Sequence, residues 1–148
     1  MTLWHLAHIV GFTLWLGGGL AGMFIGISGR REDRPNQALV VRMLTGIHRV
    51  VMLPGIVLTL ASGVALSIPA AKLGSPSSWL MLMQICGVLA GLLVLFVSLP
   101  TLGRLSRLSP TGDTGRAFDA LRKRQAMAGM IAGILGVLAM LGGVFFKY

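Results

Sequence analysis

The chain has 148 residues, of which 55% are hydrophobic and only 11% are charged, and its formal net charge at pH 7 is +9. This composition excludes a soluble globular protein and predicts a single transmembrane domain over 1–148. Nucleic acid is excluded as a partner because the basic residues lie in short segments between apolar runs, not on a basic folded face.

Four apolar runs are each long enough to cross the hydrocarbon core of a bilayer, which needs about 20 helical residues. They cover 3–27, 47–69, 79–102 and 126–146. Because only helices and closed barrels satisfy their backbone groups in lipid, runs of this length and character predict helices. We therefore predict an all-α fold, a bundle of four transmembrane helices.

The polar segments between the runs differ in charge. Segments 30–42 and 104–125 are rich in arginine, whereas 70–78 carries only Lys72 and the C-terminus only Lys147. Lys and Arg concentrate in the cytoplasmic loops of membrane proteins. We therefore predict that the two arginine-rich segments face the cytoplasm and that both termini lie outside.

The first run opens with two histidines one helical turn apart, in the stretch HLAHIVGFTLWLGG. His8 lies inside the apolar span and shares a helical face with Trp15 and Gly18, so we expect its ring to point into the bundle. An imidazole at this depth is costly without a partner, which favours a functional role. His5 lies nearer the headgroups, where an imidazole is also stable without any function.

The second run has His48 near its cytoplasmic start, and Met52 follows one turn later. At a rise of 1.5 Å per residue, His8 and His48 differ in depth by roughly 20 Å or more. They therefore cannot bind opposite faces of one haem iron. His48 and Met52 are a second candidate ligand pair; the alternative is that His48 hydrogen-bonds a linker.

The third and fourth runs place further candidate partners at the predicted depth of His8. These groups are Met81, Met83, Gln84 and Met140. A histidine with a second histidine or a methionine is a ligand set for haem, and the same side chains suit Cu(I). The alternative function of the methionines is packing, because Met fills irregular apolar gaps.

Small residues repeat at four-residue spacing in every run, which predicts faces on which helix backbones approach closely. The repeats are Gly18, Gly22 and Gly26; Gly55, Thr59 and Gly63; Gly87 and Gly91; and Gly129 and Gly133. Pro54 and Pro100 are expected to disturb their helices. Asp113 or Thr114 is expected to cap a short helix ahead of the fourth run.

The acidic residues all lie in the arginine-rich segments. They are Glu32, Asp33, Asp113 and Asp119. No carboxylate is therefore available in the predicted spans for a proton relay, a cation pathway or general acid–base catalysis. This argues against a carboxylate-driven transporter and leaves the histidines, Cys86, Gln84 and the methionines as the groups with chemistry inside the spans.

Two stretches resemble known families. LAHIVGFTLWLGGGLAG resembles the first helix of a superfamily of small four-helix membrane proteins, which includes the copper-resistance D family, a related uncharacterised membrane family and the membrane protoporphyrinogen oxidase of many bacteria. Residues 43–66 resemble the second helix of the oxidase family, with Arg49, Met52 and Gly63 at matching places. The resemblance implies a multi-pass protein of the bacterial inner (plasma) membrane.

Within this resemblance, His8 matches the histidine of the first helix, and Trp15 belongs to the same motif. The match implies haem b ligation in the oxidase branch and copper handling in the other. The oxidase family carries a lysine shortly after the tryptophan of the third helix, but Met and Gln follow Trp79 here. Haem binding is therefore better supported than oxidation of protoporphyrinogen.

We favour a membrane-embedded haem b protein with a metal site in the outer leaflet, active in redox chemistry or electron transfer and a candidate oxidoreductase. The alternatives are a copper-handling membrane protein and a cofactor-free accessory subunit of a larger membrane complex. Expected partners are the lipid bilayer and a quinone or redox protein, and the glycine faces allow a homo-oligomer. Candidate cofactor-binding residues are His8, His48, His5, Trp15 and Arg49. Candidate metal ligands are His8, Met81, Met83 and Met140.

Overall fold

The computed structural model describes residues 3–72 and 77–145. Within this part of the chain, four helical segments are long and apolar enough to cross a membrane: Leu3–Ser28, Arg34–Pro69, Ser78–Leu105 and Gly112–Phe145. They contain the predicted runs except for residue 146, which lies outside the described residues, as does Lys147. The predicted all-α, four-helix membrane fold is confirmed.

Two of the four segments contain an irregular turn. The first segment is α1 (Leu3–Ser28). The second comprises α2 (Arg34–Ile47), the π-helical turn η1 (His48–Met52) and α3 (Leu53–Lys72). The third comprises α4 (Ser78–Leu93), the π-helical turn η2 (Val94–Ser98) and α5 (Leu99–Leu105). The fourth is α6 (Gly115–Phe145), which follows the 3-10 turn η3 (Gly112–Thr114).

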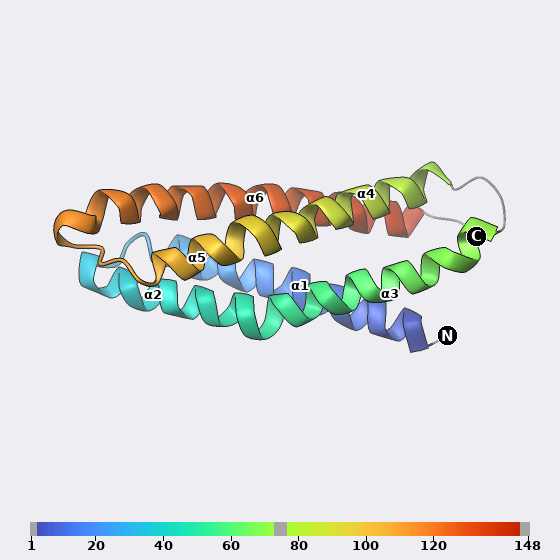
Figure 1. Cartoon of the computed structure of the whole chain (residues 1–148), viewed down its shortest axis with the longest axis horizontal. Coiled ribbons are helices and arrows are strands. Elements are labelled where there is room, and N and C mark those ends of the chain that lie inside the picture. The colour runs from blue at the N-terminus through green and yellow to red at the C-terminus, as the bar shows by residue number, and fades with distance from the viewer. Residues whose placement is uncertain (1–2, 73–76, 146–148) are drawn as a thin grey trace.

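The helices lie along one long axis as two antiparallel hairpins (Figure 1). In the first hairpin α1 packs along α3, and in the second α4 packs along α6. The loops 29–33 and 106–111 lie at one end of the bundle, which we call the basic end because of its arginines. α1 begins and α6 ends at the opposite end, which we call the terminal end.

Direct backbone contact holds each hairpin together. A Cβ atom added to Gly11 of α1 would lie 2.8 Å from the Thr59 nitrogen, and one added to Gly55 of α3 would lie 2.7 Å from the Trp15 nitrogen. In the second hairpin, a Cβ added to Gly142 of α6 would lie 2.9 Å from backbone atoms of α4. Any side chain at these glycines would therefore push the helices apart.

The predicted glycine faces are correct for most of the first hairpin and wrong for α6. Gly18 lies against Met52, and Gly22 lies against His48. Among the described residues, an added Cβ would meet nothing within 4 Å at Gly26, Gly129 and Gly133. The buried face of α6 carries other small residues, namely Ala128, Ala132, Gly136, Ala139 and Gly142. Alanine also permits close approach and loses less conformational entropy than glycine, so it can replace glycine there.

A π-helical turn lies just before a proline in each hairpin. In η1 the Leu53 amide donates to the His48 carbonyl, and Pro54 follows. η2 repeats this arrangement, with the Leu99 amide donating ahead of Pro100. A proline cannot donate a backbone hydrogen bond, and its ring collides with the carbonyl four residues earlier, so the wider turn relieves the clash. The expected helix disturbance thus takes the form of a π turn.

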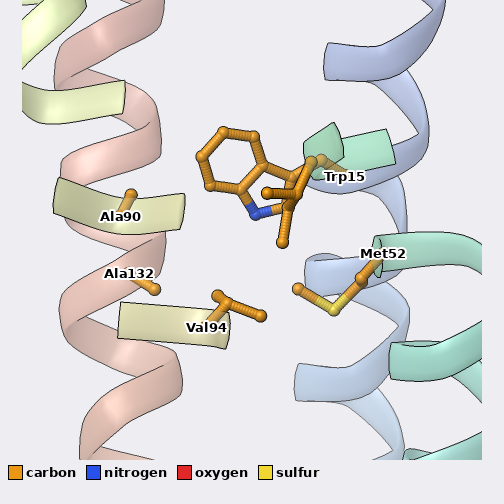
Figure 2. Close-up of a cluster of buried hydrophobic side chains, with 6 residues drawn as sticks. Trp15, Met52, Ala90, Val94 and Ala132 are labelled. Atoms are coloured by element: carbon orange, nitrogen blue, oxygen red, sulfur yellow. The ribbon is translucent and has the colours of Figure 1, made fainter. Parts of the chain in front are cut away.

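The two hairpins meet around Trp15, whose side chain is 6% exposed. Figure 2 shows the indole extending from α1 towards Ala90 of α4, while Met52 and Val94 reach into the same space from η1 and η2. Ala132 of α6 closes the cluster. Truncating a buried aromatic side chain costs about 3–5 kcal/mol, so this cluster is a principal contact between the hairpins.

At the basic end the helices continue beyond the predicted apolar runs. A second buried cluster joins α2, α5 and α6 there, and it consists of Val41, Leu102, Leu105 and Phe118. Arg34 of α2 donates two hydrogen bonds of 2.9 Å to the carboxylate of Asp119 on α6. Most of the segments 30–42 and 104–125 is therefore helical, because each carries apolar residues that reach this cluster.

The short, separately capped helix expected ahead of the fourth run is not formed within the described residues. Asp113 and Thr114 lie inside η3, which leads directly into α6. The Thr114 hydroxyl donates to the Ser109 carbonyl at 2.8 Å instead of capping a separate helix. Because Phe118 is fully buried, the first turns of α6 are fixed to the bundle and continue into the apolar span without a break.

Candidate functional site

His8 is held against α3 through its Nδ1 atom. This atom lies 3.1 Å from the Thr59 carbonyl oxygen and 3.0 Å from Ser62 Oγ. Ser62 donates its own hydroxyl proton to the Leu58 carbonyl at 2.6 Å, so both neighbours of Nδ1 are acceptors. Nδ1 therefore carries the proton, and Nε2 keeps its lone pair.

A histidine held in this way is suited to bind a metal. Metal-ligating histidines commonly donate their second ring N–H to a carbonyl or another acceptor, which fixes the ring and raises the basicity of the ligating nitrogen. Gly63 leaves room for the ring, because a Cβ added there would lie 3.3 Å from His8 Cε1. His8 can thus coordinate through Nε2 while its contacts with α3 stay intact.

The three candidate methionine ligands belong to the second hairpin. Met81 and Met140 are 47% and 40% exposed and face outward. Met83 packs on α6, where its sulfur lies 3.3 Å from a Cβ added to Gly143. Among the described residues, His8 hydrogen-bonds only α3, in the first hairpin. A metal site that joins these methionines to His8 stays a prediction.

The other candidate cofactor-binding residues lie in three different surroundings. Trp15 is part of the core between the hairpins. His5 is half-buried on α1, one turn closer to the terminal end than His8. Arg49 is exposed, although the preceding His48 is only 7% exposed. Neighbouring residues of one helix point in different directions, so His48 faces the bundle and Arg49 faces its surroundings.

His48 is a second ordered imidazole, in the basic half of the bundle. Its Nδ1–H donates to the Leu44 carbonyl at 2.9 Å, which leaves the lone pair on Nε2. The side-chain amide of Gln125 on α6 approaches this Nε2 at 3.4 Å and acts as the donor. His48 therefore links the two hairpins through Gln125, whereas His8 is bound within one hairpin.

Two buried polar atoms have no hydrogen-bond partner among the described residues, namely Ser98 Oγ and Gln125 Oε1. Ser98 is fully buried. A helical serine commonly donates to the carbonyl four residues back, but the Val94 carbonyl already accepts the Leu99 amide in η2. Buried orphan groups of this kind are usual sites of ordered water.

The two histidines are too far apart to share one metal ion. His8 is level with Ser62, and the helical rise from His48 to Ser62 is about 20 Å. The distance agrees with the separation expected from the sequence. Each histidine therefore has to be considered as a separate site.

Sequence reasoning missed the residues that orient the two rings. Ser62 lies three residues after Thr59, on the same face of α3, and Gln125 precedes the fourth apolar run by one residue. The repeat of a polar residue on the inward face of the helix, at Thr59 and Ser62, could have indicated the role of Ser62. The partner of His48 could not be found in this way, because pairing α6 with η1 depends on how the hairpins dock.

Gln84 makes a further polar contact between the hairpins, near the terminal end. Its side-chain amide donates to Ser67 Oγ at 2.7 Å, and Ser67 in turn donates to the Gly63 carbonyl at 2.7 Å. Gly63 also adjoins His8. Gln84 is therefore connected through Ser67 to the part of α3 that adjoins His8, and a site shared by Gln84 and His8 stays a prediction.

The ligand inventory restricts the type of metal site. Among residues 3–72 and 77–145, no group of three or more His, Cys, Asp or Glu side chains could hold a metal ion. Cys86 is a free, buried cysteine. A metal centre at His8 would thus need most of its ligands from a source other than these side chains.

Comparison with known proteins agrees with the membrane fold. A family model described as "Predicted integral membrane protein (DUF2269)" matches residues 2–146. No curated protein and no solved structure matches the chain. The relation to the copper-resistance D and protoporphyrinogen oxidase families stays a prediction. The match covers nearly the whole chain, and the chain therefore belongs to the DUF2269 family of predicted integral membrane proteins.

Proposed function

We propose that this protein is a membrane-embedded redox protein that binds haem b, with His8 as the axial ligand. The observation that carries the proposal is the contact of His8 Nδ1 with the Thr59 carbonyl and Ser62 Oγ, at 3.1 and 3.0 Å. These two acceptors fix the tautomer in which Nε2 is the ligating atom. A bound haem would supply one-electron exchange at its iron.

The donor set favours haem over copper. Copper held by side chains alone needs several soft donors in one place. Met81 and Met140 face outward and Met83 packs on α6, so the methionines offer His8 no compact soft set. A haem brings its own equatorial nitrogens, and a single histidine is then a sufficient protein ligand.

The location of the site follows from the loop charges. We place the basic end in the cytoplasm of a bacterial inner membrane, because arginine-rich loops favour that side. His8 then lies in the outer half of the bilayer. The proposed electron partner is therefore a quinone in the bilayer or a redox protein at the outer surface.

The first experiment is an absorption spectrum of the protein purified from haem-replete cells, oxidised and then reduced with dithionite. We expect a Soret band and a reduced α-band in the wild type and in His48→Ala. His5→Ala should change the spectrum only modestly. His8→Ala should lose the bands, because it removes the bond to the iron, while helix content by circular dichroism stays unchanged.

Each other outcome points to a different function. A folded His8→Ala protein with an unchanged spectrum, together with loss of haem in His48→Ala, would move the site to the basic end and overturn the proposal. A colourless wild type with stoichiometric copper by elemental analysis would support the copper-handling alternative. A wild type with neither would support a cofactor-free subunit of a membrane complex.

A topology experiment tests the placement independently. A C-terminal reporter that is active only in the cytoplasm should be silent if both termini lie outside. The same reporter inserted in the 106–111 loop should be active. The reverse pattern would place His8 in the inner half and exclude an outer electron partner.

A further inference from the structure

A groove with basic residues at one end runs between the two helical segments of the second hairpin. It has a volume of about 330 Å³ and lies between α4–η2 on one side and α6 on the other. Its apolar lining includes Leu93 and Val97 on the first side and Met127 and Ile131 on α6. These four residues lie in the predicted membrane spans.

The basic end of the groove carries Lys123 and Arg124. Both side chains are exposed, and neither makes a hydrogen bond or ion pair within the described part of the chain. The preceding Arg122 differs, because it donates to Gln37 Oε1 at 2.7 Å. The nearest acid along α6, Asp119, is already paired with Arg34. The two cations at the groove are therefore uncompensated.

The groove has the polarity and the length of a lipid site. Only Gln125 separates Lys123 and Arg124 from the apolar run of α6, so they lie at the membrane–water boundary. The helical rise from Lys123 to Ile131 is about 12 Å, close to the roughly 15 Å depth of one leaflet's hydrocarbon. A phosphate at the boundary and an acyl chain along the groove would thus match both of its parts.

We propose that this groove binds one anionic phospholipid of the surrounding bilayer, with its phosphate at Lys123 and Arg124 and an acyl chain against Val97 and Met127. Basic pockets between transmembrane helices bind anionic headgroups by this combination of charge and apolar surface. A second copy of the chain is a poorer occupant. It has only four acidic residues, of which Asp119 is already paired.

The test is native mass spectrometry of the delipidated, detergent-purified protein titrated with phosphatidylglycerol or phosphatidylcholine. We expect one phosphatidylglycerol to bind in preference to phosphatidylcholine. The double variant Lys123→Gln/Arg124→Gln should weaken that binding about 30-fold, which is roughly fivefold for each of the two headgroup-facing charges. The matched control, Arg104→Gln/Arg107→Gln, removes two exposed charges from the same end but outside the groove, and it should change binding less than about threefold.

A third variant tests the apolar part of the site. Met127 is 51% exposed, so Met127→Trp should fold normally while its larger side chain fills the groove and reduces bound phosphatidylglycerol with both charges in place. Equal losses in the two charge variants would show diffuse surface attraction and overturn the proposal. So would equal affinity for the two lipids, or a protein dimer that is lost in Met127→Trp while lipid binding is unchanged.

Discussion

His8 and His48 make the same kind of hydrogen bond through Nδ1 but differ in the hydrogen bonding of Nε2. In both rings Nδ1–H donates to a backbone carbonyl of the first hairpin, Thr59 for His8 and Leu44 for His48. Nε2 of His48 then accepts from Gln125 of the second hairpin, whereas Nε2 of His8 has no hydrogen bond within the described residues. The same side chain can thus serve as a connection between hairpins or as an oriented ligand.

The surroundings of the two rings explain this difference. At mid-depth the hairpins are joined by the Trp15 core, and in the basic half by the cluster around Phe118 and the ion pair between Arg34 and Asp119. In the terminal half, the polar contact found between the hairpins is that of Gln84 with Ser67. His48 in the basic half therefore hydrogen-bonds the opposite hairpin, whereas the hydrogen bonds of His8 within the described residues are to its own hairpin.

The largest stability effect is expected for His48→Ala. The variant loses the bond to Leu44, leaves the Gln125 amide without an acceptor and opens a cavity beside Gly22, so we expect a loss of about 2 kcal/mol. In cofactor-free protein, His8→Ala should lower the free energy of unfolding by roughly 0.6 kcal/mol, because the half-buried His8 ring forms hydrogen bonds within one hairpin. Unfolding in mixed detergent–SDS micelles measures both values. Equal losses would remove the distinction between the two histidines.

The parts of the fold that depend on local composition could be predicted from the sequence. The four spans follow from hydropathy, and Pro54 and Pro100 mark the positions of both irregular turns. The close contact at Gly55 follows from small-residue spacing. Each of these features is determined by a short stretch of chain.

Features that depend on docking between helices were predicted less well. Gly129 and Gly133 have the right spacing but lie on the wrong face of α6, and only the packed position of α4 determines that Ala132 is buried. Gln125 is likewise seventy-seven residues from His48 in the chain. The sequence predicted that the His8 ring points into the bundle. Its tautomer could be assigned only from the positions of the two acceptors on α3.

A smaller effect is expected at the basic end, where adjacent arginine and lysine residues have different roles. Arg122→Gln removes the 2.7 Å bond to the buried Gln37 and should cost about 1 kcal/mol. Lys123→Gln, one residue later, removes a charge that has no partner among the described residues, and it should change stability by less than about 0.5 kcal/mol. The same SDS unfolding assay compares them. A larger loss for Lys123→Gln would show that the groove charge stabilises the protein itself.

Gln125→Leu should have a smaller net effect on stability than Arg122→Gln, about 0.5 kcal/mol. The substitution removes the 3.4 Å donor to His48, but it also removes Oε1, which is buried and has no partner in the described part of the chain. These two changes oppose each other, since an unsatisfied buried acceptor is itself unfavourable. The His48→Ala/Gln125→Leu double variant completes a mutant cycle. A coupling energy near zero would mean that the two side chains are neighbours without a stabilising bond.

Ser62→Ala should affect stability as little as Lys123→Gln does, but it tests the ligand role of His8 most specifically. It removes one of two acceptors of His8 Nδ1–H and leaves the Thr59 carbonyl, so the fold should lose less than about 0.5 kcal/mol. The imidazole becomes less basic and stabilises ferric iron less, so the reduction potential of the haem-loaded protein should rise.

Ser98→Ala is the matched control, because the buried hydroxyl of Ser98 has no partner among the described residues and belongs to the second hairpin. A spectroelectrochemical titration should show a shifted potential for Ser62→Ala and an unchanged one for Ser98→Ala. Equal potentials in both variants would mean that Ser62 positions the helix and not the ligand.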